Sequence, residues 1–82
     1  MSIKKLPLTS GNKIVKVFEH FGWVSAYGKN HFVLSHPGVP PALKISIPDR
    51  REVDRALLKA EIRKALATGI TEENFLEIYE RL

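Results

Sequence analysis

Residues 23–36, WVSAYGKNHFVLSH, decide the fold that this sequence predicts. Two short runs rich in aromatic and β-branched residues flank residues 28–30, and this pattern is typical of a β-hairpin with a tight turn. Side chains alternate between the two faces of a strand, so Phe32 and Leu34 share one face. If that face packs on the core, His31 lies on the opposite, outward face.

The rest of the chain supplies one further strand and the helices that cover the hairpin. Ser10 is a suitable N-cap for a first helix, and Gly22 ends it. Residues 43–47, LKISI, alternate strictly and predict a third strand. Residues 49–69 predict one long amphipathic helix, and Thr71 is placed to cap a last short helix.

Apolar residues at helical spacing support these helices. The first helix carries such a stripe at Ile14, Val15, Val17, Phe18 and Phe21. The long helix carries one at Val53, Leu57 or Leu58, Ile62, Ala65 and Leu66, with Gly69 at its C′ position. The last helix has an apolar face of Phe75, Leu76, Ile78 and Tyr79.

The element order is therefore α-β-β-β-α with a short C-terminal helix, in one domain over residues 1–82. Sequential strands usually pair with their neighbours, which predicts an α+β fold with a three-stranded antiparallel sheet and helices on one face. The other face is left open. The same order is that of the double-stranded RNA-binding domain, which reads RNA by shape and 2′-hydroxyls.

Composition narrows the classes of function. Of the 82 residues, 44% are hydrophobic and 27% are charged, which are ordinary globular values. The absence of cysteine excludes disulfides and thiolate metal sites. The N-terminal MSIKKLPL lacks the apolar run of a signal peptide, and no run approaches the length of a membrane span. We expect a cytoplasmic protein.

Charge is distributed unevenly along the chain. Residues 1–70 hold 12 Lys or Arg against 5 Asp or Glu, whereas residues 71–82 have a net charge of −3. A basic body suggests a polyanionic partner, although a solubilising surface without a partner gives the same pattern. On the long helix Arg55, Lys59 and Arg63 form a basic stripe, flanked by Arg50, Arg51 and Lys64. Such a stripe contacts phosphates or is simply solvated.

The open sheet face offers one residue suited to proton transfer. It carries His31 with Ser35, Lys44 and Ser46, and Lys29 lies in the turn above. Histidine titrates near neutral pH, and RNA brings its own nucleophile, the 2′-hydroxyl, so one histidine and nearby cations suffice for cleavage in principle. A shared metal ion is not expected, because His31 and His36 point to opposite faces of the strand. We expect no cofactor.

Several motifs in this order resemble the HicA family of bacterial toxins, over roughly residues 10–76. They are Gly22-Trp23 after the first helix, His31, HPG at 36–38, ISIP at 45–48 and ITEENF at 70–75. The resemblance implies a fold like the double-stranded RNA-binding domain. It also implies a cofactor-free mRNA interferase of a type II toxin–antitoxin pair, which a HicB-type antitoxin neutralises by covering the active face.

Carried over by position, the resemblance makes His31 the catalytic residue. Trp23 would be a packing residue, and His36-Pro37 would be mainly structural. The family usually has glycine and then serine or glycine directly before the histidine, whereas this chain has Lys29 and Asn30. We expect these two residues to contact RNA, Lys29 as a phosphate ligand, with Lys44 nearby and Arg55, Lys59 and Arg63 farther out.

Two other readings stay open. A non-catalytic RNA-binding module of the same fold would bind RNA with strong salt dependence and leave it intact. A protein-interaction domain would use the open face and the basic surface for an acidic partner and would have no affinity for RNA at physiological salt.

Overall fold

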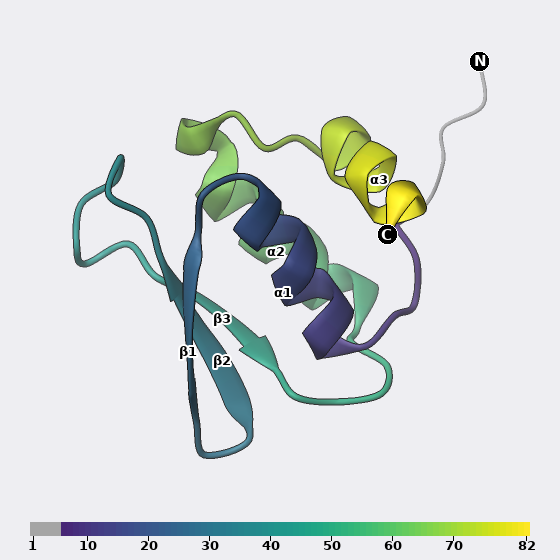
Figure 1. Ribbon diagram of the computed structural model, residues 1–82. Helices are drawn as coiled ribbons and strands as arrows, with labels where there is room; N and C mark the ends of the chain where they lie inside the picture. Colours follow the sequence, from purple (N-terminus) through teal and green to yellow (C-terminus); the bar gives the residue numbers. More distant parts are fainter. Residues whose placement is uncertain (1–5) are drawn as a thin grey trace.

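The computed structural model describes residues 6–82 (Figure 1). Residues 1–5, which belong to the predicted domain and to the stretch inspected for a signal peptide, lie outside the described residues. The elements in chain order are α1 (Gly11–His20), β1 (Val24–Gly28), β2 (His31–Ser35), β3 (Ile45–Pro48), α2 (Arg55–Lys64), a 3₁₀ turn η1 (Ala65–Thr68) and α3 (Glu72–Arg81). The fold is α+β, as the sequence predicts.

The three strands form one antiparallel sheet in the order β1-β2-β3, which confirms the predicted pairing. Gly28 pairs with His31, so the connecting turn consists of Lys29 and Asn30 alone. Their φ angles are 45° and 67°, the left-handed conformation that a two-residue type I′ turn requires at both positions. Gly28, which the sequence placed in the turn, is the last residue of β1.

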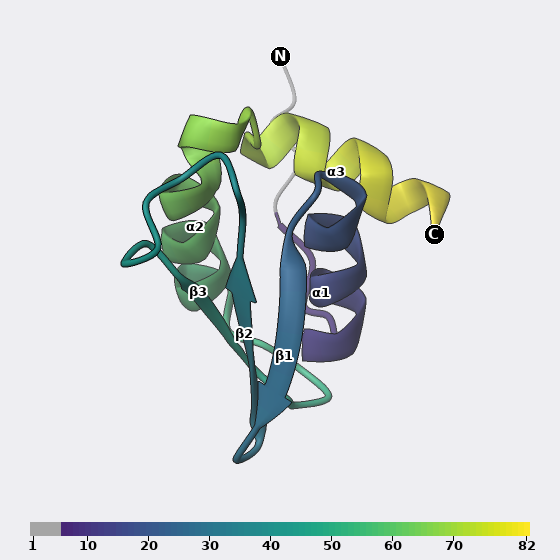
Figure 2. The same cartoon turned by 60° about the vertical axis from the view of Figure 1, so that its left-hand side comes forward.

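The helices pack on one face of the sheet. α1 contacts all three strands, α2 contacts β3, and α3 packs against α1. The fully buried side chains come from every layer and include Ile14, Phe18, Leu34, Ile45, Ile47, Val53, Leu58, Ile70 and Phe75. No helix among residues 6–82 covers the opposite face, and the β1–β2 hairpin extends past the N-terminal end of α1 (Figures 1 and 2).

The predicted long helix over residues 49–69 begins too early in the chain and is not one continuous α-helix. α2 starts only at Arg55, after an extended Asp54. Upstream, backbone hydrogen bonds join the segment to the residues before α1: the Val53 N–H donates to the Thr9 carbonyl, and the Gly11 N–H donates to the Arg50 carbonyl. These bonds hold residues 50–53 outside the helix. Beyond Lys64 the chain tightens into η1, where Leu66 is 62% exposed rather than part of the apolar stripe.

The helix ends follow local rules that the sequence displays. Ser10 caps α1, where its Oγ accepts from the Lys13 N–H at 3.3 Å. Gly69 adopts a φ of 87° after η1, as a left-handed C′ glycine does. Thr71 and Asn74 form a reciprocal capping box at the start of α3. These three predicted boundaries are confirmed.

Candidate functional site

His31 is the first residue of β2 and is half-buried. Phe32 and Leu34 pair with Ile47 and Ile45 on the face that packs on the core, so alternation puts His31 on the face without helices. The Nδ1 atom of His31 lies 3.1 Å from the Lys29 carbonyl oxygen. A carbonyl oxygen only accepts, so this hydrogen bond requires a proton on Nδ1. In the neutral ring Nε2 then carries the lone pair and is able to accept a proton.

His31 lines a pocket of about 330 Å³. The pocket lies where α2 passes the open edge of β3. Its wall is shared by β2, β3, the segment after β3, and α2, and is formed by His31, Ser46, Pro48, Arg50, Leu57 and Glu61. The pocket therefore brings together a proton acceptor (His31), a cation (Arg50), a hydroxyl group (Ser46) and the apolar side chains of Pro48 and Leu57.

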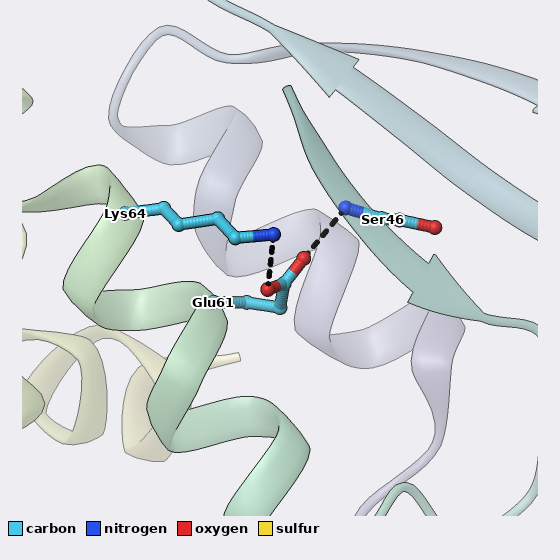
Figure 3. A network of polar contacts seen from close by, with 3 residues as sticks. All are labelled: Ser46, Glu61 and Lys64. Atoms are coloured by element: carbon cyan, nitrogen blue, oxygen red, sulfur yellow. Dashed lines mark hydrogen bonds and ion pairs between the residues drawn. The ribbon is translucent and has the colours of Figure 1, made fainter. Parts of the chain in front are cut away.

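Glu61 is the buried acid of this wall, with a residue exposure of 6% (Figure 3). Its Oε1 accepts from the Ser46 backbone N–H at 2.8 Å, and its Oε2 pairs with the Lys64 ammonium at 2.9 Å. Ser46 lies on the edge strand, whose outward N–H groups have no strand partner. The carboxylate thus fixes α2 against the edge of β3 and is itself neutralised by Lys64. In the sequence Glu61 stands between Lys59 and Arg63, and no local pattern there predicts its contact with β3.

We expect Glu61→Ala to lower the free energy of unfolding by about 1–3 kcal/mol, because the substitution leaves the part-buried backbone N–H of Ser46 without its acceptor. Urea denaturation followed by circular dichroism measures the loss. Lys64→Ala is the matched control: the Lys64 side chain is 46% exposed, so this variant should lose less than about 1 kcal/mol. Equal losses in the two variants would contradict the role given to the Ser46 hydrogen bond.

The structure separates the predicted RNA-binding residues into two groups. Lys29 and Asn30 occupy the exposed hairpin turn, and Lys44 is exposed just before β3. The basic residues of α2 lie elsewhere. Residues i and i+2 of an α-helix lie about 200° apart around the helix axis. Lys59 therefore points away from the side of α2 on which Glu61 contacts β3.

Arg55 in this second group has a structural contact. Its Nε donates to the Leu6 carbonyl at 2.6 Å, which fastens the segment before α1 to the start of α2. Arg55, Lys59 and Arg63 share one side of α2 and, like Lys29, Asn30 and Lys44, do not line the pocket. Of all the predicted site residues, only His31 does.

The other two histidines have different surroundings. In His36 both ring nitrogens are used: Nδ1 accepts from the Gly38 N–H at 2.8 Å, and Nε2 donates to the Phe21 carbonyl at 3.2 Å. Its ring also packs on Trp23, with centroids 5.3 Å apart. His20 is exposed in the last turn of α1. Only His31 combines an oriented ring with a position at the pocket, and no group of three or more potential metal ligands occurs within residues 6–82.

A hydrogen bond connects the end of the hairpin to the segment after β3. The Tyr27 hydroxyl donates to the Asp49 Oδ2 atom at 2.9 Å, and the Tyr27 ring packs on Phe32 with centroids 5.1 Å apart. This hydrogen bond, with smaller contributions from desolvation and from the negative charge of Asp49, raises the pKa of Tyr27 above its ordinary value of 10.0. The contact holds Asp49, and with it the start of the pocket wall, against the hairpin.

The Tyr27 contact predicts a dependence of stability on alkaline pH. The pKa is raised in the folded state, so the stabilisation is complete below pH 10 and is lost as pH rises through the raised value. Chemical denaturation of the wild type and of Tyr27→Phe between pH 8 and pH 12 tests this. The difference in stability between the two should shrink over the upper part of that range. A constant difference would show that the hydroxyl proton is not held by Asp49.

Comparison of the chain with protein-family models, with curated proteins and with solved structures gives no match. Within residues 6–82 no helix has the length and apolar character needed to cross a membrane. The features of the chain that indicate a function are therefore the chemistry of the pocket and the sequence motifs.

Proposed function

We propose that this chain is a metal-independent endoribonuclease of the HicA type, with a fold like the double-stranded RNA-binding domain. The observation that supports this most is the orientation of His31 and its position at the pocket. Its Nδ1 is oriented by the Lys29 carbonyl, and the residue lines a pocket at the edge of β3, between the open face of the sheet and α2. An oriented imidazole beside space for a substrate is what general acid–base catalysis requires.

In the proposed reaction the RNA supplies the nucleophile. The 2′-oxygen attacks the adjacent phosphorus while its proton passes to Nε2 of His31. A bond forms between the 2′-oxygen and phosphorus, and the bond from phosphorus to the 5′-oxygen breaks. The leaving 5′-oxygen takes a proton from His31 or from water. The products are a 2′,3′-cyclic phosphate and a 5′-hydroxyl, and no metal ion is needed to balance the step.

RNA binding would rest on the basic surface around the pocket. Lys29 and Asn30 in the turn and Lys44 beside β3 flank the open face and would contact the RNA backbone. Arg55, Lys59 and Arg63 would reach more distant phosphates around α2, with Arg55 also engaged by Leu6. Such contacts release counterions, so affinity should fall steeply with salt.

The same surface fits the proposed partner. A HicB-type antitoxin with an acidic surface would be steered to the basic body of this chain in the cytoplasm and would cover the open sheet face. That face carries Val24, which is 63% exposed, and the half-buried Val33 beside His31. Apolar side chains next to a basic rim suit a protein partner as well as RNA.

A second candidate is an RNA-binding module without catalysis. The observation that favours it is the turn itself, where Lys29 and Asn30 stand directly before His31 and are both exposed. The HicA pattern has small residues there, which allow a closer approach of the phosphate backbone. In this alternative the turn would hold RNA too far from the imidazole for proton transfer.

Incubation of the purified protein with end-labelled single-stranded RNA, with and without EDTA, tests the proposal. We expect cleavage that EDTA does not change and products that end in a 2′,3′-cyclic phosphate. Intact RNA that is bound with strong salt dependence would establish the binding module instead. Absence of both cleavage and binding at physiological salt would leave a protein-interaction domain.

A further inference from the structure

We infer that Arg50 is the phosphate ligand of the pocket beside β3 and holds the phosphate that is cut next to His31. The inference rests on the proposed function and adds to it a residue that the sequence placed only beside the basic stripe of the long helix. Four observations carry it: the position of Arg50, its lack of partners, the fixation of its backbone and the engagement of the nearby acids by other groups.

Among residues 6–82, Arg50 is the only lysine or arginine in the wall of the pocket. It shares this wall with His31 and Ser46, whereas Lys29, Lys44 and the basic residues of α2 do not line it. A phosphate group that enters the pocket therefore meets one guanidinium and one imidazole. The guanidinium would stabilise negative charge on the phosphate, and the imidazole would accept a proton from the same ligand.

The guanidinium of Arg50 is available for a ligand. Within residues 6–82 it has no hydrogen bond and no ion pair, and the residue is exposed. Asp49, its neighbour in the chain, accepts from the Tyr27 hydroxyl. Glu61, in the same wall, is paired with Lys64 and with the Ser46 N–H. Asp49 and Glu61 therefore both have partners other than Arg50.

The backbone of Arg50 is held from both sides. Its N–H donates to the Pro48 carbonyl at 3.0 Å, and its carbonyl accepts from the Gly11 N–H at 2.9 Å. Because α1 and the end of β3 fix the main chain in this way, only the side chain has to be ordered when a ligand binds. An anchored but unpaired arginine beside a pocket is well suited to bind an anion.

The guanidinium presents parallel N–H donors that match two oxygens of a phosphate. During attack by the 2′-oxygen, negative charge grows on the two non-bridging oxygens. Arg50 stays protonated throughout and donates to these oxygens, while His31 receives the proton of the 2′-hydroxyl. Donors that are already in place for developing charge usually contribute more to rate than to substrate affinity.

Arg50→Ala tests the inference, and Arg51→Ala is the matched control, since Arg51 is its exposed neighbour with the same charge but does not line the pocket. The first measurement is binding of adenosine 3′-monophosphate, followed by the NMR signals of the His31 ring. We expect Arg50→Ala to weaken binding at least about tenfold and Arg51→Ala to leave it within about threefold.

The second measurement is kcat and KM for RNA cleavage. Arg50→Ala should lower kcat by about 10²–10³-fold with a smaller change in KM, and Arg50→Lys should recover part of the rate, because it keeps the charge and loses the paired donors. Circular dichroism and thermal unfolding show whether each variant is folded.

The two proposals fail in different ways. If the wild type does not bind the nucleotide, if Arg50→Ala binds it as the wild type does, or if Arg51→Ala loses binding equally, Arg50 is not the phosphate ligand, whatever happens to RNA. If the nucleotide binds through Arg50 and RNA stays intact, the phosphate site stands and the ribonuclease proposal falls. Normal cleavage by Arg50→Ala would reject the inference and leave the ribonuclease.

Discussion

The His31→Ala variant should lose RNA cleavage by about 10²–10⁴-fold, the usual contribution of a general acid or base. The fold should not change, because the ring is half-buried and its hydrogen bond is made to the carbonyl of Lys29 within the same turn. Single-turnover cleavage of end-labelled RNA measures the rate, and thermal unfolding measures the stability. RNA affinity should stay within about threefold, since the phosphate contacts are made by other residues.

The two other histidines supply controls of different kinds. His20→Ala changes an exposed ring in α1 and should affect neither cleavage nor stability. His36→Ala removes two hydrogen bonds and the contact with Trp23, so it should lower stability and reduce activity only through loss of folded protein. A His31→Ala protein that still cleaves at the wild-type rate would end the proposed mechanism.

Gly11→Ala should cause the largest loss of stability among the Gly→Ala substitutions in this chain, at about 3 kcal/mol. A Cβ atom at Gly11 would lie 2.0 Å from the Pro48 carbonyl oxygen and 3.0 Å from its carbonyl carbon. Both are backbone atoms, so no side-chain rotation relieves the overlap. The Gly11 N–H also donates to the Arg50 carbonyl, which ties the same two segments together.

Thermal unfolding of Gly11→Ala should show a fall in Tm of roughly 10–20 °C for a domain of this size. Gly28→Ala is the matched control, because a Cβ atom there meets nothing within 4 Å and its φ is not positive. We also expect Gly11→Ala to weaken nucleotide binding where the protein is still folded, since Pro48 and Arg50 line the pocket. A Tm equal to that of Gly28→Ala would show that α1 does not pack so closely on β3.

The contrast between Gly11 and Gly22 shows how far a sequence can be read. Gly22 follows the last apolar residue of a helical pattern, and its φ of 92° agrees with its predicted role in ending α1. Gly11 has no such local signal. It is needed because residue 48, far away in the chain, brings a carbonyl group against the first turn of α1.

The candidate site also contains one feature that the local sequence predicts and others that it does not. Alternation along β2 was enough to place His31 on the open face, because side-chain direction in a strand is a local property. The neighbours of His31 were not predictable. Arg50 and Glu61 reach the pocket because the segment after β3 stays outside the helix and α2 then runs along the edge of β3.

The sequence by itself determined the order of elements, the pairing of the strands, three helix boundaries and the face on which His31 lies. These features follow from periodicity, capping and turn formation, which act over a few residues. Only the tertiary structure decided where α2 begins, which residues line the pocket and which basic residues lie apart from it. Those features depend on hydrogen bonds and close contacts between segments that are far apart in the chain, such as Gly11 with Pro48 and Ser46 with Glu61, and such contacts leave no pattern in the local sequence.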